Sequence, residues 1–269
     1  MTAEAIAPGE EVEDAYGAPS LLLRALEWRA GLEYGAMLAS YPALRMAPHG
    51  DGHPVLVLPG FTAGDRTTRP LRAYLSELGY TTYGWGLGVN LGPTERVLEQ
   101  LPERLADLGD NHGEPVSLIG WSLGGIFARE MARHSPDSVR QVLTLGSPFN
   151  LVHHRATHAT RLYRAMARFH SPRLSSRMPN EFERGPLPVP ATSIYSRTDG
   201  VVAWQSCLQE PDGRHENIEV WGSHVGLGVN PVVLFIIADR LAQSAGQWEP
   251  YRPMSTIARF LPPLRPYPG

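Results

Sequence analysis

Residues 116–125, VSLIGWSLGG, decide the fold: a short apolar run leads directly into a G-x-S-x-G sequence. The apolar run predicts a buried strand, and the pattern from Leu123 to His134 predicts a helix. Where a strand turns sharply into a helix, the residue at the corner is strained and side chains two positions away must be absent. Gly120 and Gly124 meet that requirement. Ser122 is therefore a candidate nucleophile, placed at the positive end of a helix dipole.

Outward from this turn, short apolar segments alternate with segments of helix length. The predicted strands are 55–58, 81–85, 116–119, 139–145, 191–195 and 218–221, and the predicted helices between and after them are 68–78, 93–108, 123–134 and 231–243. Such alternation indicates βαβ units. We expect a mostly parallel sheet with helices on both of its faces.

The two ends of the chain differ in composition from the middle. Residues 1–18 are predicted to form an acidic arm, followed by a helix over 20–38 whose apolar stripe packs on the body. That stripe comprises Leu21, Ala25, Trp28 and Leu32. Residues 19–249 are expected to form one domain, and the proline-rich tail 250–269 is expected to lack regular structure.

Two loops offer partners for Ser122. Asp199 lies in S-R-T-D-G after the strand 191–195, and His224 lies in G-S-H-V-G after the strand 218–221. In sheets of this kind the order is nucleophile, acid, histidine, and catalytic groups gather at the carboxyl ends of the strands. His224 would then serve as base, with Asp199 fixing its tautomer. Glu210 and Asp212 are rival acids, but their polar loop is better explained by solvation.

Acyl chemistry also needs N–H donors aimed at the developing oxyanion. The first candidate is the backbone N–H of Leu123, next to the nucleophile. The second is the N–H of Phe61, in the turn P-G-F-T that follows the strand 55–58. A simple turn that ends the strand is the alternative for this second position.

An insertion of about 148–190 is too long for a plain crossover and is expected to be a helical lid. Its apolar face would contribute Leu162, Met166 and Phe169 to a substrate pocket, together with Trp121 and Phe149. Arginines occupy the opposite face. A solvated basic face is the simple interpretation, and docking of an acyl carrier protein or an anionic membrane surface is the alternative.

Composition excludes several other classes. The net charge of −3 and the absence of any Lys among the 24 basic residues argue against nucleic-acid binding, Schiff-base chemistry and a phosphate-loop lysine. Cys207 is the single cysteine, and His154 and His158, although spaced like metal ligands, have no evident third ligand. We expect no metal. No signal peptide or membrane-spanning run is recognisable, which predicts a cytoplasmic protein.

Taken together, these residues resemble the α/β-hydrolase superfamily, and within it bacterial lipases and esterases. The resemblance extends from about Pro54 to Ala242 and includes L-P-G-F at 58–61, T-L-G-S-P at 144–148 and S-R-T-D-G-V-V at 196–202. It implies a Ser–His–Asp hydrolase that needs no cofactor and acts on small-molecule or lipid-like esters. The chain has Phe149-Asn150 where such lipases usually have His and Gly, which weakens the transfer of true lipase activity.

Two alternatives to an ester hydrolase remain open. One is a thioesterase or acyltransferase for carrier-bound acyl groups; the elbow also looks like that of carboxylesterases that act on carrier-bound methyl esters. The other is a non-catalytic binding module on the same fold. The presence of all three triad residue types and both elbow glycines favours an enzyme over the second alternative.

Overall fold

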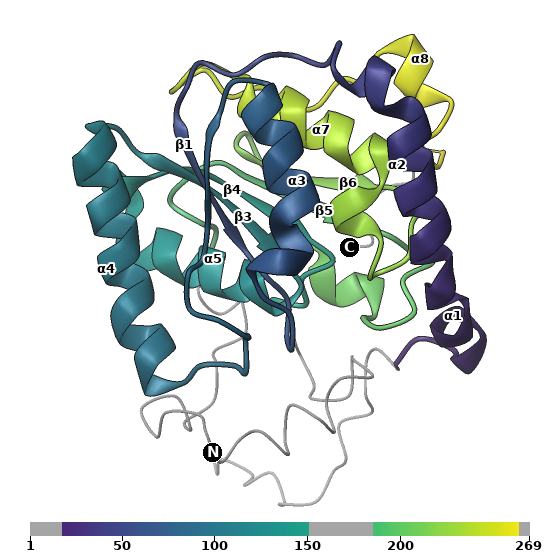
Figure 1. The fold of residues 1–269 in the computed structure, drawn as a ribbon, viewed down its shortest axis with the longest axis horizontal. Helices are drawn as coiled ribbons and strands as arrows, with labels where there is room; N and C mark the ends of the chain where they lie inside the picture. Colours follow the sequence, from purple (N-terminus) through teal and green to yellow (C-terminus); the bar gives the residue numbers. More distant parts are fainter. Residues whose placement is uncertain (1–17, 151–184, 264–269) are drawn as a thin grey trace, which may run out of the picture.

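The computed structural model of the 269-residue chain describes residues 18–150 and 185–263 (Figure 1). Its centre is a six-stranded sheet in the order β2-β1-β3-β4-β5-β6, and every neighbouring pair is parallel. The strands are β1 (Pro54–Leu58), β2 (Thr81–Gly84), β3 (Val116–Trp121), β4 (Val139–Leu145), β5 (Ala191–Tyr195) and β6 (His215–Glu219). Because all strands run the same way, the loops that follow them leave from one end of the sheet.

Helices cover both faces of the sheet, as the alternating pattern predicts. The α-helices are α1 (Leu21–Ala25), α2 (Ala30–Leu44), α3 (Asp65–Glu77), α4 (Glu95–His112), α5 (Leu123–His134), α7 (Pro231–Leu241) and α8 (Ser255–Ala258). The short 3₁₀ helices are η1 (Leu26–Arg29), η2 (Pro136–Ser138), η6 (Trp204–Cys207) and η7 (Leu227–Val229). None of the described helices is both long and apolar enough to cross a bilayer.

Alternating side chains of β1 divide the core into two layers. Val55 and Val57 belong to the cluster that contains the buried residues of α3 and α7. Leu56 and Leu58 belong to the cluster under α4 and α5. Successive side chains of a strand point to opposite faces, so the two helical layers pack on opposite sides of the sheet (Figure 1). The predicted α/β fold with helices on both faces is confirmed.

The prediction for the N-terminal helix is wrong in two respects. The helical segment extends to Leu44, and the apolar stripe faces solvent: Leu21, Trp28 and Leu32 are 75%, 67% and 62% exposed. The side of the segment that meets the body carries charged residues, which bind the backbone of neighbouring loops. The apolar stripe consequently points away from the core.

The C-terminal tail contains regular structure over Ser255–Ala258, where none was expected. This short helix α8 lies between the prolines of the tail, and Ile257 and Leu261 pack against the core. Tyr251 N–H also donates to Glu216 Oε2 of β6 at 2.7 Å. Packing of this part of the tail thus offsets its high proline content. The predicted arm and the middle of the predicted lid lie outside the described residues.

Candidate active site

The turn between β3 and α5 places Ser122 in an unusual backbone conformation, with φ 52° and ψ −122°. A non-glycine residue there stores about 1–3 kcal/mol of strain. The turn closes because its glycines leave no room for side chains. A Cβ on Gly120 would overlap the backbone of Gly125, and a Cβ on Gly124 would overlap the carbonyl of Leu58. The geometry is that expected of a nucleophile elbow.

Asp199 and His224 form a buried pair at the carboxyl ends of β5 and β6. Asp199 Oδ2 lies 2.6 Å from His224 Nδ1, and the two residues are 3% and 6% exposed. The other carboxylate oxygen, Oδ1, accepts the N–H groups of Val201 and Val202, each at 2.7 Å. The carboxylate is therefore fixed on both sides. It holds the proton of the imidazole on Nδ1 and leaves Nε2 as the basic nitrogen.

Burial and the charge of Asp199 shift the pKa of this histidine in opposite directions. Burial by itself lowers the pKa of the His224 imidazole, but the charge of Asp199 and its hydrogen bond to the ring outweigh that effect. The pKa is raised from its ordinary value of 6.5.

Several contacts bring the serine to the same corner. Ser122 N–H donates to Leu145 O at 2.8 Å, and the next residue, Gly146, lies against the acid–base pair. A Cβ on Gly146 would be 3.1 Å from His224 Nδ1 and 3.2 Å from Asp199 Oδ2. Trp121 Nε1 also donates to His224 O at 3.1 Å. The three sequence-predicted residues thus converge at one end of the sheet.

Their hydrogen bonding is incomplete. Within the described residues, Asp199 and His224 are joined, but no hydrogen bond links the Ser122 hydroxyl to the His224 imidazole. Catalytic hydrogen bonds are often long in the absence of substrate and tighten when it binds. The acid–base pair is preformed, and the serine stands beside it.

The loop after β1 passes directly against the serine. A Cβ on Gly60 would lie 3.2 Å from Ser122 Cβ, and Thr62 bends the chain with φ 63°. Phe61 and Leu123, the two residues predicted to supply N–H donors, therefore flank Ser122 from separate elements.

Asn90, which the sequence analysis did not single out, holds this loop in place. It is fully buried, and its side-chain amide donates to Pro59 O at 2.8 Å. Its backbone accepts from Thr62 N at 2.7 Å and donates to Ala63 O at 2.8 Å. No local motif surrounds Asn90 that would have identified it.

Comparisons with known proteins agree with this fold. A family model described as "PGAP1-like alpha/beta domain" matches residues 95–202, a range that includes Ser122 and Asp199. Among solved structures, lipase B of Aspergillus fumigatus is 19% identical with a TM-score of 0.55, and the match covers 76% of this chain and 58% of that one. The lipase-esterase related protein of Clostridium acetobutylicum is 13% identical with a TM-score of 0.51, covering 72% of this chain and 97% of that one. A search of curated protein sequences gave no match.

The chain has the α/β-hydrolase fold. It spans 58% of the length of the Aspergillus lipase.

The structure describes only some of the predicted pocket residues. Trp121 packs on Gly228, where a Cβ would lie 2.7 Å from the indole ring, and it closes the corner beside Ser122. Phe149 is buried in the core, with the guanidinium of Arg129 3.9 Å from its ring centre. Leu162, Met166 and Phe169, like the histidines 154 and 158, lie outside the described residues. The role of these residues in substrate binding stays a prediction.

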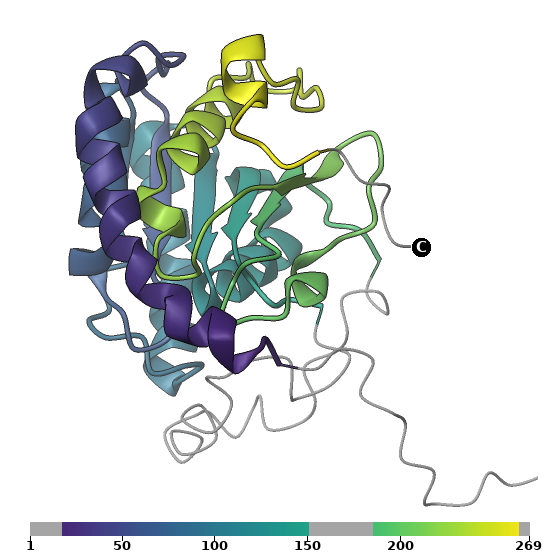
Figure 2. The same cartoon turned by 90° about the vertical axis from the view of Figure 1, so that its right-hand side faces the viewer.

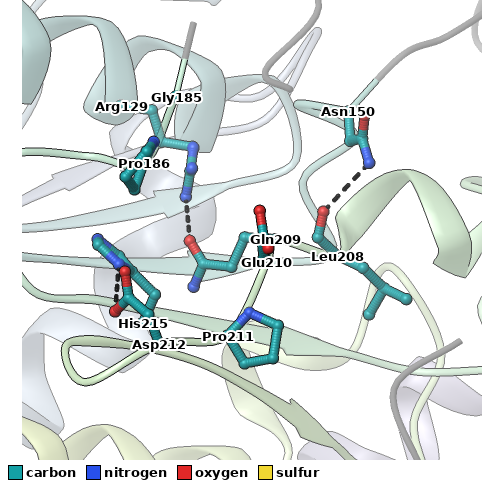
Figure 3. Close-up of a pocket in the computed structure, with 10 residues that line it drawn as sticks. All are labelled: Arg129, Asn150, Gly185, Pro186, Leu208, Gln209, Glu210, Pro211, Asp212 and His215. Carbon is teal, nitrogen blue, oxygen red and sulfur yellow. Dashed lines mark hydrogen bonds and ion pairs between the residues drawn. The ribbon is translucent and has the colours of Figure 1, made fainter. Parts of the chain in front are cut away.

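A cavity of about 290 Å³ lies elsewhere in the described part of the molecule (Figure 3). Arg129, Asn150, Gln209 and His215 are among its lining residues, whereas Ser122, Asp199 and His224 are not. The Arg129 guanidinium is already bound to Gln209 Oε1 at 2.7 Å. The rival acids Glu210 and Asp212 also line this cavity, together with His215. We assign no part in acyl chemistry to it, because none of its described lining residues is a serine, threonine or cysteine that could act as nucleophile.

Proposed function

We propose that this protein is a serine hydrolase that cleaves carboxylic esters through an acyl-enzyme intermediate. Ser122 would be the nucleophile, His224 the general base and Asp199 the residue that orients it. The observation that carries the proposal is the buried Asp199–His224 pair, 2.6 Å apart, at the end of the sheet where Ser122 occupies a turn with φ 52°. A preformed acid–base pair beside a strained serine is the arrangement that acyl transfer requires.

In the acylation step, Ser122 Oγ attacks the ester carbonyl carbon while its proton moves to His224 Nε2. The carbonyl oxygen becomes an oxyanion, which the N–H groups of Leu123 and Phe61 would stabilise. Collapse of the tetrahedral intermediate expels the alcohol, which takes the proton back from Nε2. Asp199 stabilises the imidazolium during this interval and itself stays ionised.

Deacylation repeats the sequence with water. His224 removes a proton from the water molecule, which attacks the acyl carbon of the Ser122 ester. The intermediate then releases the carboxylic acid, and the proton on Nε2 returns to Ser122 Oγ. Acid and base therefore regain their starting states, and no cofactor is consumed.

An apolar acyl group is the substrate class that we propose. Trp121 directly precedes Ser122 and Phe61 follows Gly60, which lies against Ser122; both aromatic side chains pack on the core. The insertion 148–190 is predicted to add an apolar face. A carrier-bound acyl group is an alternative form of the same substrate, because the acylation step would be identical.

Active-site labelling tests this function directly. We expect a fluorophosphonate to modify Ser122, identified by peptide mass spectrometry, and a p-nitrophenyl ester of the preferred chain length to protect against labelling. A chain-length series of these esters would locate that preference, and a carrier-bound thioester assayed in parallel would reveal a thioesterase. Labelling at other serines, or no labelling with no turnover, would refute the proposal.

A further inference from the structure

The N-terminal segment reaches the same end of the sheet as the candidate active site (Figure 2). Helix α1 packs so closely on the Asp199 loop that a Cβ on Gly200 would overlap the carbonyl of Leu23. The segment 21–44, which precedes the sheet in sequence, therefore packs directly against the loop that carries Asp199.

One carboxylate of this segment binds both loops that carry the proposed acid and base. Glu27 Oε1 accepts the N–H of Gly200 at 2.8 Å and the N–H of His224 at 3.0 Å. Glu27 Oε2 accepts the N–H of Val225 at 2.9 Å. Gly200 directly follows Asp199, and Val225 directly follows His224. A single side chain therefore fixes the backbone at both members of the pair.

Two further charged residues complete the contact from the same segment. Arg29 donates to the carbonyl of Thr198 and, at 3.0 Å, to that of Gly222. Glu33 Oε1 accepts the N–H of Ser223 at 2.8 Å and lies 3.8 Å from Arg29 Nε. Buried backbone N–H and C=O groups need hydrogen-bond partners. Here those partners are charged side chains, which form stronger hydrogen bonds than neutral ones.

We propose that Glu27 is a positioning residue, whose carboxylate holds the Asp199 loop and the His224 loop in the relative position that proton transfer to His224 requires. The inference rests on the proposed function, since it assigns these loops to catalysis. Misplacement of a catalytic group by about 1 Å can cost about a hundredfold in rate. Because Glu27 binds the N–H of His224 itself, movement of this carboxylate would be transmitted to the base.

The charge of Glu27 also affects a second measurable quantity, the pKa of His224. Burial lowers the pKa of His224, and the carboxylates of Asp199 and Glu27 are the charges that raise it. A side chain that only stabilised the fold would leave the titration of the base unchanged when replaced by an isosteric neutral one.

The test compares Glu27→Gln and Glu27→Asp with the full-length wild type. In Glu27→Gln, one carboxylate oxygen becomes an NH₂ group that cannot accept from Val225. We expect kcat to fall by about tenfold to a hundredfold with little change in KM, and the acid limb of the pH–rate profile to move to lower pH. Glu27→Asp keeps the charge on a shorter side chain, so kcat should fall while the acid limb stays in place.

Glu99→Gln is the matched control, because Glu99 is exposed on α4 and its replacement removes the same charge. It should keep wild-type kcat and pH profile.

A lower melting temperature in Glu27→Gln with unchanged kcat and acid limb would overturn the inference. If Glu27→Gln does not fold, a folded Glu27→Asp with wild-type kcat would overturn it, and loss of folding in both variants would reduce Glu27 to a structural role, which also overturns it. A wild type that neither turns over esters nor labels at Ser122 would refute the proposed function instead.

Discussion

Two rows of serine, histidine and aspartate lie at opposite ends of the same sheet. At the amino ends of the strands, His53 Nε2 is 2.9 Å from Ser117 Oγ, and His53 Nδ1 is 2.5 Å from Asp51 Oδ1. At the carboxyl ends, Asp199 and His224 are 2.6 Å apart and Ser122 lies beside them. By hydrogen bonding alone, the first row is the more complete.

What differs is the backbone that surrounds the two serines. Ser117 lies inside β3, paired with β1, and both it and His53 are 0% exposed. Ser122 occupies the strand–helix turn, is only partly buried, and lies against Gly60 in the loop after β1. Under the proposed function, access for a substrate and N–H donors for an oxyanion would distinguish the catalytic row from the structural one, whereas hydrogen bonding within the row would not.

The pKa values of the two histidines are also shifted in opposite directions. Burial lowers the pKa of His53, and nearby Arg140, which binds Asp51 Oδ2 at 2.9 Å, adds to that effect against the influence of Asp51. The pKa of His224 is raised, because Asp199 outweighs burial. The surroundings of His53 therefore disfavour its protonated form, and those of His224 favour it.

The largest contrast is expected between the two serines. Ser122→Ala should lower kcat by about four to six orders of magnitude, the range seen when serine proteases lose their nucleophile. Ser117→Ala should keep kcat within about threefold and instead lower the free energy of unfolding by about 1–3 kcal/mol, because His53 loses a buried partner. Ester turnover and chemical denaturation measure the two effects, and a large fall in kcat for a folded Ser117→Ala would remove the distinction.

The next contrast separates the two aspartates. Asp199→Asn should reduce kcat by about three to four orders of magnitude, since the imidazole would lose the partner that fixes its tautomer. Asp51→Asn should leave turnover nearly unchanged. Hydrogen bonds from His53 and Arg140 overcome burial and lower the pKa of Asp51 below its ordinary 3.8, so the stability that this carboxylate contributes is present above pH 3.8 and lost as the pH falls further. Equal kcat in wild type and Asp199→Asn would contradict the assignment of the acid.

A smaller effect on kcat is expected from Asn90, which holds the loop after β1 and touches none of the three proposed catalytic side chains. The row at the amino ends of the strands has no comparable loop. Asn90→Ala removes the hydrogen bond to Pro59 O and should loosen the position of the Phe61 N–H, which lowers kcat by about tenfold to a hundredfold. Leu98→Ala is the control: Leu98 is half-buried on α4, and its replacement also truncates a side chain to alanine. Wild-type kcat in Asn90→Ala would show that this loop is not needed for oxyanion stabilisation.

The smallest effects are those of pH on the unmodified protein. The acid limb of kcat/KM should have its midpoint above 6.5, because His224 must be neutral to act as base and its pKa is raised. His53 should affect stability and not turnover: its lowered pKa means that the unfolded chain binds the proton first, so the free energy of unfolding falls as the pH drops below 6.5. Imidazole titration by NMR would separate the two, and a midpoint below 6.5 for His224 would contradict the first expectation.

Elements with a clear apolar pattern were predictable from the sequence. The bounds of α5, β4 and β5 agree with their predicted ranges, because each is bracketed by glycine, proline or polar residues. Strand β6 begins three residues before its predicted start at 218, at His215. Its first residues are polar but buried, with Glu216 bound to Thr192 and Arg240, and such partners cannot be recognised from local sequence.

Some residues of the candidate site could likewise be predicted from the sequence, and others could not. Ser122, Asp199 and His224 follow strands, so their convergence could be inferred from the parallel sheet. Glu27 and Asn90 bind backbone N–H and C=O groups. Any polar side chain of suitable reach could make such bonds, and no sequence motif marks these two residues. The outward orientation of Trp28 was missed for the same reason, since the charged contacts on the opposite side of its helix were not foreseeable.

The bonds from Glu27 join residues that are 173, 197 and 198 positions apart. On the ribosome, the N-terminal segment emerges first and its partners emerge among the last strands, so about 10–40 s of synthesis separate them at ordinary elongation rates. Contacts of such long range also form late and slowly when a chain refolds. The bonds that fix the Asp199 and His224 loops should therefore be among the last to form, after most of the sheet has assembled.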